Sequence, residues 1–90
     1  MKTIWKYKVD SSAGTLWLPE HKIVHVGYDR EHTPCFWAEI FDTNGLQKCY
    51  TFSVYGTGNP IQNNRESYVG TMIAKSGFVW HLYLSDRLAA

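Results

Sequence analysis

The segment that decides the fold is residues 35–55, which read CFWAEIFDTNGLQKCYTFSVY. Apolar and aromatic residues recur at every second position on both sides of Asn44-Gly45, and this dipeptide is the strongest short-range signal for a β-hairpin. We predict a two-residue type I′ turn there, with both strands paired in one sheet. The register of that turn sets four cross-strand pairs: Phe41 with Lys48, Glu39 with Tyr50, Trp37 with Phe52, and Cys35 with Val54.

Alternation with a period of two continues along the rest of the chain, and helical periodicity is almost absent. In the run at residues 22–28, for example, Val24, Val26 and Tyr28 share one face. We predict an all-β fold: a single domain over residues 1–90, with about seven short, mainly antiparallel strands in a small sandwich or partly open barrel and little or no helix. Outside the central segment the expected strands are residues 3–9, 15–18, 22–28, 68–74 and 78–84, the last two paired around Lys75-Ser76-Gly77.

The near-neutral charge of the chain excludes several classes of partner. A formal net charge of +1 over 90 residues provides no field to steer the protein onto long nucleic acid or anionic lipid. No apolar run is long enough to cross a membrane, and the opening MKTIWKYKVD lacks the apolar core of a signal peptide. We therefore expect a cytoplasmic protein with no membrane partner and no long nucleic acid partner.

Two cysteines and a small core bear on stability. In the predicted hairpin Cys35 and Cys49 point to opposite faces, so we expect two free thiols. A domain of this size builds only a thin core, and without disulfide bonds such domains often gain stability by association. We therefore expect a homo-oligomer.

No arrangement of metal ligands or catalytic residues stands out in the sequence. His21 and His25 are four residues apart, which on a strand means about 13 Å, too far to hold one ion. Although His32 and Cys35 lie nearby in the sequence, we expect structural or surface histidines and no metal site. Because the chain has no nucleophile motif and its acidic residues are scattered, we expect no enzyme and no cofactor. The enzymatic alternative is a hydrolase that uses His81 as a general base.

The stretch Tyr55-Gly56-Thr57-Gly58-Asn59-Pro60 ends an aromatic strand abruptly. Two glycines beside Asn-Pro can hold backbone N–H groups toward a polar or anionic ligand. The stretch lacks the Lys of a P-loop, although Arg65 follows in a polar loop. A tight corner between two strands explains the same residues equally well.

Aromatic side chains are more numerous than a small core needs. The sequence has four Trp and six Tyr residues, whose side chains need polar partners when buried. Some of these rings should therefore border a groove. Aromatic rings stack on nucleobases for about 1–3 kcal/mol each. Because few cations accompany them, a small nucleotide suits this chain better than a nucleic acid strand. The alternative is that most of these rings are core or oligomer contacts.

Six blocks of the sequence, taken in order, carry a resemblance to other proteins. They are Lys2-Thr3-Ile4-Trp5-Lys6-Tyr7, Leu18-Pro19, Pro34-Cys35-Phe36-Trp37-Ala38, Phe52-Ser53-Val54-Tyr55-Gly56-Thr57-Gly58-Asn59-Pro60, Tyr68-Val69-Gly70-Thr71 and Phe78-Val79-Trp80-His81. In this order they resemble a family of small uncharacterised proteins of bacteriophages and bacteria. The resemblance implies a phage accessory protein, and small β-rich phage proteins include inhibitors of host defence that sequester nucleotide signals.

Together these observations lead to one hypothesis and one main alternative. The hypothesis is a non-enzymatic phage protein that binds a nucleotide-derived immune signal, such as a cyclic dinucleotide or an ADP-ribose derivative, and so inhibits host anti-phage defence. The alternative is a module that binds a host or phage protein through exposed aromatics. The expected ligand-binding residues are Gly56, Thr57, Gly58 and Asn59 for hydrogen bonds, Arg65 for charge, Tyr55 or Trp80 for stacking, and His81 or His25 for a polar contact.

Overall fold

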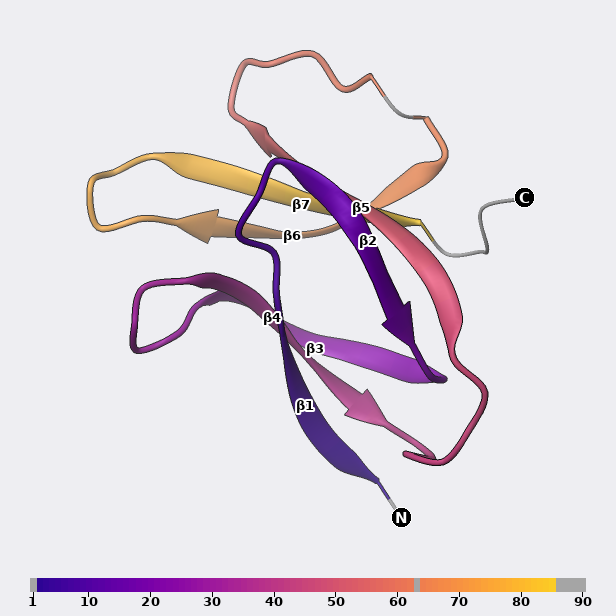
Figure 1. Cartoon of the computed structure of the whole chain (residues 1–90). Coiled ribbons are helices and arrows are strands. Elements are labelled where there is room, and N and C mark those ends of the chain that lie inside the picture. Colours follow the sequence, from indigo (N-terminus) through magenta and orange to yellow (C-terminus); the bar gives the residue numbers. More distant parts are fainter. Residues whose placement is uncertain (1, 63, 86–90) are drawn as a thin grey trace.

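The computed structural model describes residues 2–62 and 64–85, and these residues form strands and no helix (Figure 1). All strand pairs are antiparallel, so the predicted all-β fold is confirmed. In the described part of the chain no helix is long and apolar enough to cross a membrane. The strands are β1 (Thr3–Lys8), β2 (Ala13–Leu18), β3 (His21–Tyr28), β4 (Pro34–Ile40), β5 (Lys48–Gly56), β6 (Glu66–Ile73) and β7 (Val79–Ser85).

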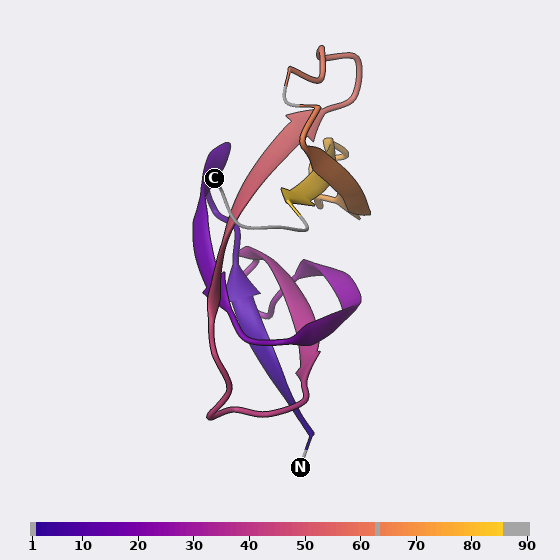
Figure 2. The same cartoon turned by 90° about the vertical axis from the view of Figure 1, so that its right-hand side faces the viewer.

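The strands divide into two sheets that face each other as an open sandwich. One sheet has the order β1-β4-β3, and the other has the order β2-β5-β7-β6. In Figures 1 and 2, β5 runs along the length of the molecule, with the three-stranded sheet below and the β6–β7 hairpin above. The chain therefore changes sheet after β1, after β2 and after β4.

The hairpin predicted at Asn44-Gly45 is wrong, because the chain crosses between the sheets at this point. The Gly45 N–H donates to the Asp42 carbonyl at 3.0 Å, and the Asn44 N–H donates to Asp42 Oδ1 at 3.0 Å. This turn begins earlier than predicted and is closed by the Asp42 side chain. A type I′ turn needs positive φ at both Asn44 and Gly45, and neither has it. None of the four predicted cross-strand pairs forms, since β4 and β5 lie in different sheets.

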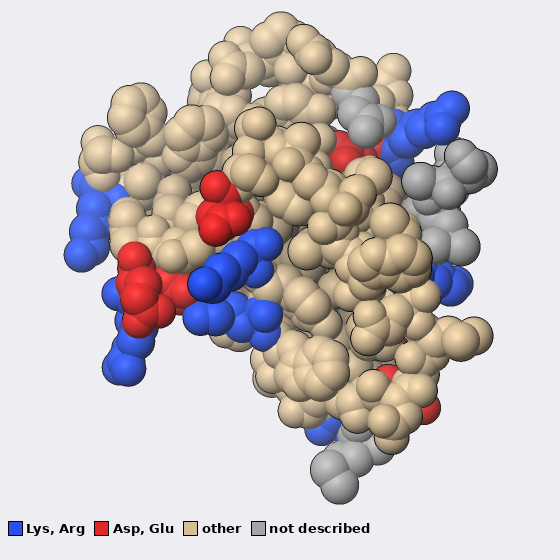
Figure 3. Space-filling view, viewed as in Figure 1, with Lys and Arg blue, Asp and Glu red and all other residues tan. Residues whose placement is uncertain are grey.

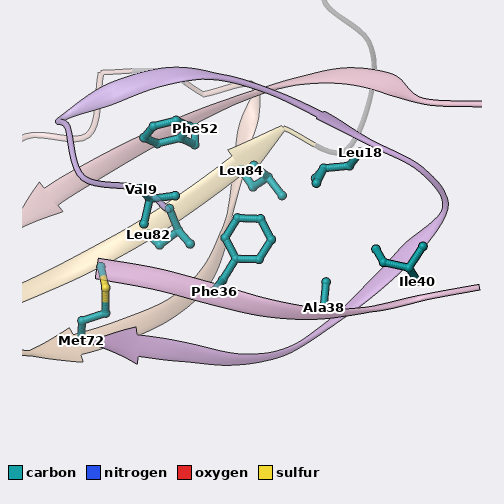
Figure 4. Close-up of a cluster of buried hydrophobic side chains, with 9 residues drawn as sticks. All are labelled: Val9, Leu18, Phe36, Ala38, Ile40, Phe52, Met72, Leu82 and Leu84. Atoms are coloured by element: carbon teal, nitrogen blue, oxygen red, sulfur yellow. The ribbon is translucent and has the colours of Figure 1, made fainter. Parts of the chain in front are cut away.

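The crossing lets two apolar faces share one core. In a single hairpin, Phe36, Ala38 and Ile40 would point away from Phe52. In facing sheets these four side chains meet, and the β4 residues are fully buried. Figure 4 shows the core between the two sheets, formed by Val9, Leu18, Phe36, Ala38, Ile40, Phe52, Met72, Leu82 and Leu84.

A bulge in β3 changes which residues face the core. The pairing of β3 with β4 shifts between Ile23 and His25, which leaves Val24 unpaired and 46% exposed. Ile23, Val26 and Tyr28 pack against the core instead. The predicted shared face of Val24, Val26 and Tyr28 is wrong at Val24, because one extra residue inverts the alternation.

The second predicted hairpin is confirmed. β6 and β7 pair on both sides of a turn in which the Ala74 N–H donates to the Phe78 carbonyl at 2.9 Å, and the Gly77 N–H donates to the Ala74 carbonyl at 2.9 Å. Gly77 has a φ of 95°, as expected for the glycine that ends a three-residue hairpin loop.

Both cysteines are free, as predicted, but the reason differs from the expected one. Cys35 is buried on β4 and Cys49 is half-buried on β5, so they belong to different sheets. The Cys35 thiol donates to the Thr33 carbonyl at 3.2 Å, and burial raises its pKa. This cysteine is a packed structural residue.

Asp29 fastens the connection between β3 and β4. Its side chain is 4% exposed, and its Oδ1 accepts the Thr33 N–H at 2.9 Å. Its Oδ2 lies 2.9 Å from Lys6 Nζ on β1, so the carboxylate links all three strands of this sheet. The Thr33 amide and then Lys6 lower the pKa of Asp29 from 3.8 to about 2.

Acid should therefore weaken the fold through Asp29. Because the pKa is lowered by folding, the contribution of the carboxylate is complete above about pH 4 and is lost as the pH falls through about 2. We expect Asp29→Asn to lower Tm at pH 6 and to flatten the decline of Tm between pH 4 and 2. Lys6→Met, which keeps the Thr33 hydrogen bond, should retain most of that decline. Thermal unfolding followed by circular dichroism measures this, and an Asp29→Asn profile parallel to that of the wild type would contradict it.

The edge strands β3 and β6 approach closely where β6 has a glycine. A Cβ at Gly70 would lie 2.7 Å from Val26 Cγ2 and 2.9 Å from Val26 Cβ, closer than carbon atoms pack. Gly70 therefore sets the distance between the two sheets at this edge.

We expect Gly70→Ala to lower the free energy of unfolding by about 1–3 kcal/mol through overpacking. In a Val26→Ala background the same substitution should cost clearly less, since the clashing methyl groups are gone. Urea unfolding of the two single variants and the double variant measures this coupling. Additive effects would show that the sheets do not meet at these two residues.

Candidate functional site

The glycine corner at the end of β5 is a tight turn. The Asn59 N–H donates to the Gly56 carbonyl at 3.1 Å, and Gly58, at the third position, has a φ of 91°. Position and φ are those of the glycine in a type II turn. The Thr57 N–H donates to the Val79 carbonyl at 3.3 Å. The Thr57 and Asn59 N–H groups thus have acceptors, whereas the Gly58 N–H has none among the described residues.

A cavity of about 250 Å³ lies against this corner, on the side of β5 and β7 that faces away from the core. It brings together six of the nine residues expected to bind a ligand. It also includes Ile61 and Tyr83, which sequence reasoning did not select. Tyr83 is two residues from His81 on the same strand face, so alternation would have found it, whereas nothing marks Ile61 in its polar loop. The lining is Tyr55, Gly56, Thr57, Gly58, Asn59, Ile61, His81 and Tyr83.

His81 is held at both ring nitrogens by threonine hydroxyls. Nε2 lies 2.9 Å from Thr57 Oγ1, and Nδ1 lies 3.0 Å from Thr71 Oγ1 on β6. Thr71 Oγ1 in turn lies 2.5 Å from the Tyr68 hydroxyl. Because each hydroxyl can donate or accept, these hydrogen bonds hold the imidazole ring in place whichever tautomer it adopts.

Three tyrosine rings continue the same surface. Tyr83 meets Tyr55 edge-on, with ring centroids 5.5 Å apart, and meets Tyr68 at 5.7 Å. Edge-to-face pairs at such distances are favourable and restrict ring motion. We call this surface, formed by Tyr55, Tyr68, His81 and Tyr83, the tyrosine–histidine face.

The other three expected ligand residues do not line this cavity. Trp80 points to the core side of β7, where its Cζ3 would lie 3.3 Å from a Cβ at Gly56. It therefore packs against Gly56, its partner residue on β5. His25 is on the other sheet and packs against Trp37, with ring centroids 5.3 Å apart. Arg65 directly precedes β6 and is not among the described residues around the cavity.

Another cavity, of about 510 Å³, lies at the opposite end of the sandwich. Glu20, Asp42 and Lys48 border it together with His21, whose Nδ1 is 2.9 Å from the Pro19 carbonyl. Within the described residues no group of three or more His, Cys, Asp or Glu is placed to hold a metal ion. His21, His25 and His32 thus do not converge with Cys35.

Charge is distributed differently around the two cavities. We call the cavity of about 250 Å³ beside the glycine corner the tyrosine–histidine cavity. None of the described residues that line it is Lys, Arg, Asp or Glu, whereas the larger cavity is bordered by side chains of both charge signs. On the face shown in Figure 3, basic and acidic side chains lie side by side. The tyrosine–histidine cavity therefore offers neutral hydrogen-bonding groups and aromatic rings.

One comparison with known proteins places the chain in a family. A family model described as "Domain of unknown function (DUF7352)" matches residues 1–89. The chain belongs to this family. No curated protein and no solved structure matches it. Membership in DUF7352 agrees with the resemblance to an uncharacterised family and assigns no activity, so function is argued from the site.

The corner glycine gives a direct test of this geometry. No atom lies within 4 Å of a Cβ added at Gly58, so a substitution acts through the backbone alone. We expect Gly58→Ala to cost about 1 kcal/mol of unfolding free energy and Gly58→Asn clearly less, because Asn tolerates positive φ. Chemical unfolding measures both variants. Equal costs would mean that the positive φ is not required.

Proposed function

We propose that the protein binds the base and ribose of a small nucleotide-derived ligand at the tyrosine–histidine face and holds it without chemical change. The observation that carries the proposal is the cavity of about 250 Å³, in which phenol, imidazole, hydroxyl and amide groups converge. A nucleoside needs ring faces and edges to stack on and neutral donors and acceptors for its polar edges. Phosphates would remain toward solvent, since no described cation lines the cavity.

Binding without turnover is favoured by the state of His81. A general base needs a nitrogen lone pair directed at the substrate. Both His81 nitrogens lie within hydrogen-bonding distance of threonine hydroxyls. The imidazole thus acts as the centre of a fixed polar network rather than as a base with a vacant nitrogen.

The family resemblance suggests the biological setting. We propose that the protein is phage-encoded and acts in the host cytoplasm as a homo-oligomer. There it would capture a nucleotide immune signal of the cyclic dinucleotide or ADP-ribose type. Stoichiometric capture requires affinity and abundance. It does not require a catalytic base or nucleophile.

The second candidate function, a protein-binding module, is favoured by exposed aromatics. Trp17 is 61% exposed on edge strand β2, and Phe78 is 66% exposed at the tip of the β6–β7 hairpin. Large exposed rings are typical anchors of protein interfaces. These two rings lie outside the lining of the tyrosine–histidine cavity, so the candidates can be separated by substitution.

Isothermal titration with cyclic dinucleotides and with ADP-ribose tests the proposal. We expect saturable binding that Tyr55→Ala and His81→Ala each weaken about tenfold or more, consistent with loss of one stacking or polar contact. Lys75→Ala, at the exposed hairpin tip, is the matched control and should bind as the wild type does. Ligand recovered after heat denaturation should be intact. Absence of heat with every ligand, or altered ligand after recovery, would refute the proposal.

A further inference from the structure

A cavity of about 310 Å³ opens between the two sheets, at the end of the core marked by Val9 and Met72 in Figure 4. It is separate from the tyrosine–histidine cavity, which lies on the outer side of the four-stranded sheet. Its walls are mostly carbon, and its exposed rim is polar. The walls are Val9, Tyr28, Pro34, Val54, Met72 and Trp80, and the rim is Asp10, Ser11 and Ser12.

We propose that this cavity is a second ligand site, for a flat, neutral or cationic aromatic group of about two fused rings. Four observations support this assignment: the rigidity of the opening, the two rings that border it, its volume, and the charge at its rim.

The opening is held by backbone hydrogen bonds to both sheets. The Val9 N–H donates to the Pro34 carbonyl of β4 at 2.9 Å, and the Val54 N–H of β5 donates to the Ser12 carbonyl at 2.8 Å. The connection from β1 to β2 is thereby anchored to each sheet and keeps them apart at this end. A ligand would meet a preformed cavity and would not need to separate packed side chains.

Two half-buried rings on opposite sheets border the cavity. Tyr28 ends β3, where its ring stacks on His32 with centroids 4.4 Å apart and planes inclined by 12°. Trp80 on β7 packs against Gly56 of β5, and its ring centroid lies 6.2 Å from that of Phe78. Burial raises the pKa of Tyr28, so its hydroxyl stays neutral. Rings fixed in this way favour a planar aromatic occupant over a flexible chain.

Volume and rim charge define the ligand further. An apolar cavity of about 150 Å³ holds benzene, and this one, at about 310 Å³, has room for two fused rings. Asp10 is exposed at the rim, and no Lys or Arg is among the described residues that line the cavity. An anionic substituent would therefore be disfavoured relative to a cationic one.

The sequence provides a specific reporter, because Met1 and Met72 are its two methionines. The experiment uses protein whose methionine methyl groups are labelled with ¹³C. Indole, N-methylquinolinium or naphthalene-1-sulfonate is titrated into it. We expect indole and N-methylquinolinium to shift the Met72 methyl signal saturably through the ring current, and naphthalene-1-sulfonate to bind at least fivefold more weakly.

Variants separate this site from the tyrosine–histidine cavity. Ser12→Tyr, at an exposed rim position, should obstruct the opening and weaken both favoured probes at least tenfold. Asp10→Asn should reduce the preference for the cationic over the anionic probe at least threefold. Tyr55→Ala should leave all three titrations unchanged, so failure of nucleotide binding would not affect this result.

Two outcomes would overturn the assignment. One is a Met72 methyl signal that no probe shifts at its solubility limit. The other is a probe affinity that falls with Tyr55→Ala and not with Ser12→Tyr, which would place the ring in the tyrosine–histidine cavity. The methyl spectrum of each variant without ligand shows that it has folded.

Discussion

The structure depends on how the inner face of β4 is covered. β4 pairs with β1 on one side and with β3 on the other, so its backbone is satisfied within a three-stranded sheet. Its apolar face still needs cover, and Phe36, Ala38 and Ile40 are all 0% exposed. The facing sheet buries all three of them. The crossing after β4 places β5, with its buried Phe52, in that facing sheet beside β2.

Because the core lies between the two sheets, the outer side of the four-stranded sheet is left available for function. Along β7, Trp80, Leu82 and Leu84 pack toward the core, so His81 and Tyr83 point away from it. Along β5 the same alternation turns Tyr55 outward next to the corner. Stability rests on the inner residues, and the hydrogen-bonded and aromatic groups of the tyrosine–histidine face are not needed to fill the core.

Strand positions and face alternation could be predicted from the sequence, because they follow from the local period of two. Pairing could not, since the signal at Asn44-Gly45 is local and competes with the demand for a second sheet. Phe36 and Phe52 show the result: the predicted hairpin points them to opposite faces, whereas the facing sheets bring them into one core. Val24 was misplaced because a bulge has no clear mark in sequence.

The residues of the candidate cavity could likewise be predicted where they depend on local sequence. Residues close in the chain, from Tyr55 to Asn59, were found together because a turn keeps neighbours together, and His81 joined them because it lies opposite Tyr55 in the register of β5 and β7. Trp80 and His25 were assigned by residue type alone. Residue type does not determine which cavity a side chain borders: Trp80 lies on the core side of β7, and His25 lies in the other sheet.

The position of Trp80 shows how the two cavities are related. The two glycines of the corner are required for different reasons: Gly58 for its φ of 91°, and Gly56 for space. A Cβ at Gly56 would lie 3.1 Å from Asn59 Nδ2 and 3.3 Å from Cζ3 of Trp80, its partner residue on β7. The Trp80 ring therefore packs against Gly56, and Trp80 also lines the cavity between the sheets. One indole thus lines the cavity between the sheets and contacts the glycine corner that lines the other cavity.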